Sequence, residues 1–182
     1  MEKTMKHFIV LLTTLGLLLP ASPLLAMNAA QKKEFERIYT MSLEDLADRV
    51  EARLEQKYPD EDWDKYRFPS FVYTDDPIEI SYKVAVKNPD LLGAANVKDK
   101  GRIIPCYCFC NRMGHDNLLY CYWQKGQVGG DFDSHASECN ICVRQALLAF
   151  LWDDLGAGHA EIISGMERKF ERLIEMHERG EI

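Results

Sequence analysis

Residues 105–142 read PCYCFCNRMGHDNLLYCYWQKGQVGGDFDSHASECNIC, and this stretch holds all six cysteines of the 182-residue chain. The thiols occur as a Cys-x-Cys-x-Cys run, one isolated cysteine and a Cys-x-x-Cys pair, with two histidines between them. Thiolate and imidazole are preferred ligands of soft and borderline metal ions, so the stretch indicates a metal site or else a dense disulfide framework. The candidate metal ligands are Cys106, Cys108, Cys110, His115, Cys121, His135, Cys139 and Cys142.

The Cys-x-Cys-x-Cys run favours metal binding over local cross-linking. In an extended backbone Cys106, Cys108 and Cys110 would project their thiols to one side, about 7 Å apart, with Tyr107 and Phe109 on the other side. A modest bend would bring those thiols onto a shared ion. A disulfide between residues two apart is strained, so the run is expected to bind a metal or to pair with distant cysteines.

The second group of ligands precedes an apolar run that is expected to be helical. If that helix is capped by Ser134, then His135, Cys139 and Cys142 fall at positions i, i+4 and i+7 on one face. Ser137 is the alternative cap. Cys139 would lie in or near the first turn, where free N–H groups favour a thiolate. The same face continues into apolar residues, so filling the site is expected to stabilise the fold.

Other chemistries that use cysteine or acidic residues fit the spacings less well. Val143 follows the Cys-x-x-Cys pair where a c-type haem site needs histidine, and neither common ferredoxin spacing is present. No strand–helix–strand pattern surrounds the pair, which argues against a thioredoxin-like site. Asp131 and Asp133 are too few for a calcium loop. Because no acid, base or nucleophile has a defined partner, we expect no enzymatic activity.

The beginning of the chain has the form of a secretory signal. Lys3 and Lys6 precede an apolar run, which is followed by Pro20 and by small residues up to Ala26. Residues 1–26 are therefore expected to be a cleaved signal peptide, although an uncleaved membrane anchor is the alternative. Export implies an extracytoplasmic location, periplasmic or secreted, in an oxidising setting where disulfides persist.

Composition bounds the remaining chain to one domain over residues 27–182. A net charge of −7 argues against nucleic acid or anionic lipid as a partner.

Apolar residues at helical spacing predict helices over residues 43–57 and 160–178, with shorter ones near 29–39 and 146–152. Residues 76–87 favour a helix, with a strand over 78–86 as the alternative. Residues 59–76 are expected to be an irregular connection whose aromatic rings pack onto the helices. The fold class predicted is mainly α, a small helical domain around a loop-rich Cys/His segment.

The ordered set of cysteines and histidines resembles a known family. The residues that carry the resemblance are Pro105-Cys106-Tyr107-Cys108-Phe109-Cys110, Gly114-His115, Cys121, His135-Ala136 and Cys139-x-x-Cys142, preceded by Asn88-Pro89-Asp90-Leu91-Leu92. They are similar to the bacterial PCYCGC-motif family of exported proteins and lipoproteins, mostly of unassigned function, over about residues 68–175. Phe109 replaces that family's glycine, which is expected to alter the turn there, and the lipid-bearing cysteine of many members is missing. The resemblance implies an envelope protein with a metal site.

These observations predict an exported protein that binds a soft metal ion, Cu(I) first and Zn(II) second, for delivery or sequestration. The partners expected are the metal ion and an envelope metalloprotein or transporter, with no nucleic acid and no membrane span after signal cleavage. Two alternatives stay open. One is a disulfide-stabilised interaction module of the envelope, and the other is an envelope thiol–disulfide oxidoreductase.

Overall fold

The computed structural model describes residues 27–93, 103–110, 114–115 and 117–182. The predicted signal peptide, residues 1–26, lies outside this part of the chain. The described residues form six α-helices and no strand, with a single β-bridge between Trp123 and Phe132, which confirms the mainly α prediction. The helices are α1 (Ala29–Thr40), α2 (Leu43–Lys57), α3 (Asp76–Lys87), α4 (Pro89–Leu92), α5 (Asn140–Asp154) and α6 (His159–Glu178). None of the helices in these ranges is long and apolar enough to cross a membrane.

Short 3-10 helices occupy the connections between the α-helices. Two of them, η1 (Trp63–Tyr66) and η2 (Ser70–Thr74), lie in the aromatic connection before α3. Three more, η5 (Leu118–Cys121), η6 (Gln124–Gly126) and η7 (His135–Glu138), lie in the cysteine-bearing segment before α5. The segment that carries most of the candidate ligands is therefore built from turns, as expected of a loop-rich region.

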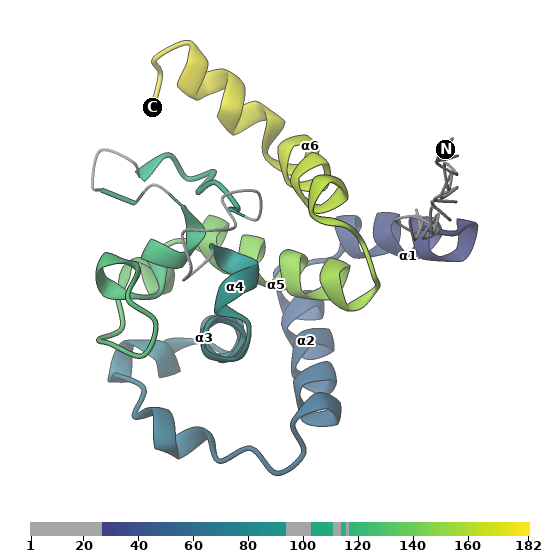
Figure 1. The fold of residues 1–182 in the computed structure, drawn as a ribbon. Helices are drawn as coiled ribbons and strands as arrows, with labels where there is room; N and C mark the ends of the chain where they lie inside the picture. Colours follow the sequence, from purple (N-terminus) through teal and green to yellow (C-terminus); the bar gives the residue numbers. More distant parts are fainter. Residues whose placement is uncertain (1–26, 94–102, 111–113, 116) are drawn as a thin grey trace, which may run out of the picture.

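Helix α5 is the centre of the domain. Every residue from Cys142 to Trp152 except Arg144 is buried, so this helix is covered on nearly all sides, as its almost entirely apolar sequence requires. Helices α1, α2, α3 and α6 all contact it. Figure 1 shows α6 running from the end of α5 back toward the loops that carry the cysteines, with the C-terminus close to those loops. The N-terminal end of α5 thus meets the loop region while its body forms the core.

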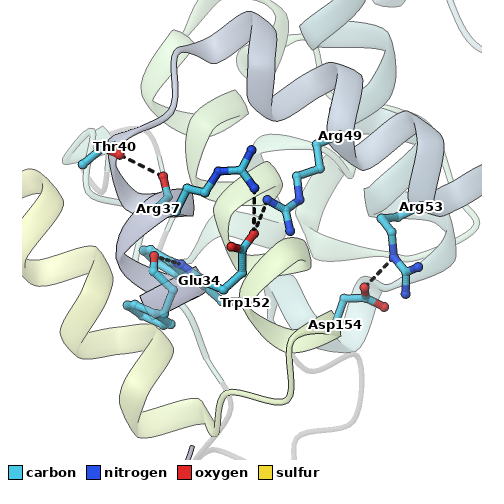
Figure 2. A network of polar contacts seen from close by, with 8 residues as sticks. Glu34, Arg37, Thr40, Arg49, Arg53, Trp152 and Asp154 are labelled. Carbon is cyan, nitrogen blue, oxygen red and sulfur yellow. Dashed lines mark hydrogen bonds and ion pairs between the residues drawn. The ribbon is translucent and has the colours of Figure 1, made fainter. Parts of the chain in front are cut away.

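Helices α1 and α2 follow the sequence predictions closely. The side chain of Ser42 accepts a hydrogen bond from the backbone N–H of Asp45 at 3.0 Å, which caps α2. Figure 2 shows how these helices are tied together and to α5 by charge: Arg49 pairs with Glu34, and Arg53 Nε lies 2.7 Å from an Asp154 carboxylate oxygen. These ion pairs lie at the edge of the apolar contact between α1, α2 and α5 and add to it.

Helix α3 settles the choice left open for residues 76–87 in favour of a helix. Its N-cap is Asp75, and Asp76 is the first helical residue. The aromatic connection before it packs as predicted: the rings of Phe68 and Phe132 lie 5.1 Å apart, and those of Phe71 and Tyr82 lie 6.0 Å apart. This connection covers the loop region from the side of α3.

The start of α5 corrects one prediction. The helix begins at Asn140 with Cys139 as N-cap, and neither Ser134 nor Ser137 caps it. Residues 135–138 form η7, and Cys139 has extended backbone angles, φ −135° and ψ 98°, which separate the two helical segments. His135 therefore does not share a helix with Cys139 and Cys142. The end of α6 agrees with the prediction, and its start differs by one residue.

A close three-way contact fixes α6 on the core. The rings of Phe35 and Trp152 stack with centroids 4.3 Å apart, and Trp152 Nε1 donates to the Phe35 carbonyl at 3.3 Å. Gly165 of α6 lies directly on this pair. A Cβ at that position would fall 2.7 Å from Phe35 Cζ and 2.9 Å from Trp152 Cη2. Only glycine lets the helix approach this closely.

Gly165→Ala is accordingly expected to destabilise the protein by about 1–3 kcal/mol through overpacking, even though alanine favours helix over glycine by about 1 kcal/mol. Chemical denaturation measures the loss. Ser164→Ala, on the exposed side of the same helical turn, is the matched control and is expected to be neutral or slightly stabilising. A Gly165→Ala protein as stable as the parent would contradict the close contact.

Candidate metal centre

Five separate pieces of chain deliver the candidate ligands to one place. The segment 103–110 brings Cys106, Cys108 and Cys110, while η5 brings Cys121 and η7 brings His135. Cys139 and Cys142 come from the cap and first turn of α5. His115 lies between the first cysteine run and η5. All six cysteines are free thiols in the structure.

The Cys-x-Cys-x-Cys run forms a turn, which corrects the expectation of an extended backbone. The N–H of Phe109 donates to the carbonyl of Cys106 at 3.1 Å and closes the turn. It brings the Cys106 and Cys108 sulfurs to 3.0 Å, and those of Cys108 and Cys110 to 2.8 Å. The division into two sides is nevertheless as predicted, because the ring of Tyr107 stacks on an α6 ring instead of facing the thiols.

Phe109 carries the strain of that turn. Its φ of +57° lies in the left-handed region, which glycine enters freely and which costs other residues about 1–2 kcal/mol. The glycine that the resembling family has at this position is therefore the residue that such a turn favours. In this chain the Phe109 ring stacks on His177 of α6 with centroids 4.1 Å apart, and this contact offsets part of the backbone cost.

Three of the thiols form a buried triangle. The Cys106 sulfur lies 3.3 Å from that of Cys121 and 3.7 Å from that of Cys142, and the Cys121 and Cys142 sulfurs are 3.5 Å apart. Cys121 and Cys142 have no exposed surface, and Cys106 is 7% exposed. We call Cys106, Cys121 and Cys142 the inner triangle. Three sulfurs at these spacings are positioned to hold one metal ion.

A second group lies beside it and, apart from the buried Cys142, is half-buried. The ligand atoms of Cys108, His135, Cys139 and Cys142 all lie within 4.8 Å of one another and can also hold an ion. We call these four residues the outer group. The Cys108 sulfur is 3.6 Å from that of Cys142 and 3.8 Å from His135 Nε2. His135, Cys139 and Cys142 therefore converge as predicted, although a 3-10 turn and an extended cap bring them together instead of one helix face.

The two remaining candidates lie at the edge of these groups. Cys110 Sγ is 3.0 Å from His135 Nε2. His115 forms a third potential ligand set with Cys121 and His135, and its ring centroid lies 4.8 Å from that of His135. Its Nδ1 is buried and finds no hydrogen-bond partner among the residues that the structure describes. All eight residues nominated from the sequence thus gather in one cluster.

Crowding of the thiols sets their acidity. Hydrogen bonds from the thiols of Cys106 and Cys121 lower the pKa of Cys108 far below its usual range. Burial, the hydrogen bond to Cys108 and the charge of Cys108 raise the pKa of Cys110 to about 12. Hydrogen bonds to Cys106 and Cys108 likewise raise the pKa of Cys142. One thiolate is therefore stabilised at the expense of its neighbours, and further ionisation requires a cation to offset the repulsion.

Gln145 holds the first cysteine against α5, and sequence reasoning did not identify it. Its side chain is fully buried, with Nε2 donating to the Pro105 carbonyl at 2.8 Å and Oε1 accepting from the Tyr107 N–H at 3.1 Å. These two bonds flank Cys106. The signal available in the sequence was a lone amide within an apolar helix, one turn after Cys142, because a buried amide needs partners.

Two tyrosines and an aspartate support the other ligands. The side chain of Asp133 accepts a hydrogen bond from the backbone N–H of His135 at 2.8 Å, and the Tyr82 hydroxyl donates to the Asp133 carbonyl at 2.6 Å. The Tyr122 hydroxyl donates to the Cys142 carbonyl at 3.1 Å. Asp133, a weak calcium candidate in the sequence, thus orients a histidine in the cluster.

Comparison with known proteins places this cluster in a family. Neither the curated proteins nor the solved structures contain a match to the chain. The family model described as "Protein of unknown function with PCYCGC motif" matches residues 44–173, which run from the start of α2 through most of α6. The match spans well over half of the chain and includes every candidate ligand. The chain therefore belongs to the PCYCGC-motif family.

Proposed function

We propose that this protein binds a soft metal ion through its Cys/His cluster, Cu(I) in first place and Zn(II) in second, and delivers or sequesters it outside the cytoplasm. The observation that supports the proposal is the convergence of six thiols and two imidazoles from five pieces of chain. Soft thiolates select Cu(I) and Zn(II) over Mg(II) and Ca(II). The extracytoplasmic location rests on the signal-like residues 1–26.

The connectivity of the sulfurs favours a shared ion over cross-links. Cys106 has three sulfur neighbours within 3.7 Å, namely those of Cys108, Cys121 and Cys142. Cys142 likewise has three, at 3.5–3.7 Å. A disulfide joins one sulfur to one other, whereas a metal ion binds three or four ligands at once. Sulfurs that each face three others, as those of Cys106 and Cys142 do, suit a metal ion better than a disulfide.

We further propose a binding role without catalysis, which the arrangement of the ligands supports. Every candidate ligand faces other ligands, and the supporting residues Gln145 and Asp133 hold backbone groups in place. Cys108 has a specific reason to react, because neighbouring thiols lower its pKa and its side chain is only half-buried. Thiol–disulfide exchange through Cys108 is therefore the second candidate function.

Purification under anaerobic conditions from the native compartment, followed by native mass spectrometry, elemental analysis and a free-thiol count, distinguishes these functions. We expect bound Cu or Zn and no disulfide. A folded, metal-free protein lighter by six hydrogens would instead establish the disulfide-stabilised module. Metal-free protein in which Cys108 alone reacts rapidly with an alkylating agent near pH 7 would favour the oxidoreductase.

Replacing Cys139 and Cys142 by serine together is expected to lower the metal stoichiometry and the melting temperature in parallel, because both residues connect the site to α5 and metal binding stabilises only the folded chain. Glu138→Gln is the control, since this exposed side chain adjoins Cys139 without facing the cluster. Elemental analysis and thermal unfolding give the two readouts. An unchanged stoichiometry in the double variant would exclude these residues as ligands.

Gln145→Leu is expected to weaken metal binding at least tenfold and to destabilise the fold by about 2 kcal/mol, because it leaves the Pro105 carbonyl and the Tyr107 N–H buried without partners. Competition with a chromophoric chelator measures the affinity. Gln124→Leu makes the same change at an exposed residue whose amide donates to the Phe132 carbonyl, and it should leave both quantities nearly unchanged. Equal effects of the two substitutions would remove the positioning role of Gln145.

A further inference from the structure

We infer that the cluster is a two-ion centre in which the thiolate of Cys142 bridges a buried ion held by the inner triangle and an exchangeable ion held by the outer group. The inference rests on the proposed function and adds to it the number of ions, their ligands and the order of their release. It follows from three features: the shared ligand, the shape of each ligand set and the difference in exposure.

The shared ligand makes the two sets compatible. Cys142 is the one residue common to the inner triangle and the outer group, and it belongs to both by distance. A thiolate sulfur has several lone pairs and can bind two ions at once. An imidazole nitrogen has only one, so the set of His115, Cys121 and His135 cannot be filled together with the outer group through the same nitrogen of His135. A bridge through sulfur is the arrangement that fills two sets.

Each ligand set has a recognisable coordination shape. The mean edge of the inner triangle, divided by √3, places its centre about 2.0 Å from each sulfur. A metal–thiolate bond is about 2.3 Å long, so an ion enters when each sulfur moves outward by about 0.3 Å. Three thiolates suit Cu(I) in low coordination. The outer group offers three thiolates and one imidazole, a tetrahedral set. Each thiol that binds releases its proton to solvent.

The two ligand sets differ in solvent exposure, so the two ions are expected to exchange at different rates. The inner sulfurs are at most 7% exposed, beneath the turn at Cys106 and against α5. In contrast Cys108, His135 and Cys139 are each half-buried, so an incoming ligand reaches an ion held by them. Transfer of a metal to a partner requires the partner's ligand to contact the ion before the last protein ligand leaves. The outer ion meets this requirement, and the inner ion anchors the turn that holds it.

The experiment loads reduced full-length mature protein with Cu(I) anaerobically and counts ions by native mass spectrometry. We expect two per chain. Addition of excess bathocuproine disulfonate should then remove them in two phases of equal amplitude whose rates differ at least tenfold. Binding of a single ion, or release of both in one phase, would overturn the two-ion centre while leaving metal binding itself intact. Failure to bind Cu(I) at all would overturn the proposed function as well.

Three cysteine variants assign the ions. Cys139→Ser should bind one ion and keep only the slow phase, whereas Cys121→Ser should bind one ion and keep only the fast phase. Cys142→Ser should lose more Cu(I) than either, because it removes the bridge. His135→Gln retains all six thiols and leaves three thiolates for the outer ion, so it should keep both ions and accelerate only the fast phase. Loss of the slow phase in Cys139→Ser would contradict the assignment.

Discussion

The structure depends on one constraint: six thiols are packed so closely that several of them can ionise together only with opposite charge nearby. Three sit in the inner triangle against the first turn of α5, with essentially no exposed surface. Removing charges from water is costly unless opposite charge lies close by. A soft cation would supply that charge, so the proposed metal would allow the packed thiols to ionise together.

The same helix serves the cluster and the core. Cys142, Gln145 and Trp152 lie successively along α5, so one rigid element holds a candidate ligand, clamps the backbone around Cys106 and anchors the contact with α1 and α6. Helix α6 then returns to the loops and presents His177 to Phe109. A substitution in the first turn of α5 therefore acts on the same helix that packs against α1 and α6.

The sequence indicated the residues of the cluster and the long helices because both are local signals. Helix α2 shows its period through Leu46, Val50 and Leu54, all of which are buried. The two corrections, at the first cysteine turn and at the start of α5, involve backbone angles that the residue types conceal. Phe109 gives no sign of a positive φ, and nothing about Cys139 signals the extended angles that place it as a cap. The role of Gln145 was not predicted, because the sequence does not show which backbone groups a buried amide will bond.

The turn at Phe109 shows how this chain differs physically from the motif of its family. Glycine at that position would relax the left-handed backbone but would leave nothing to stack on α6. Phenylalanine accepts the backbone cost and gains a ring contact with His177, whose Nδ1 is buried and lacks a partner among the described residues. The contact joins the first cysteine turn to the last turn of α6. In this chain, the last turn of α6 thus contributes to holding the thiol turn closed.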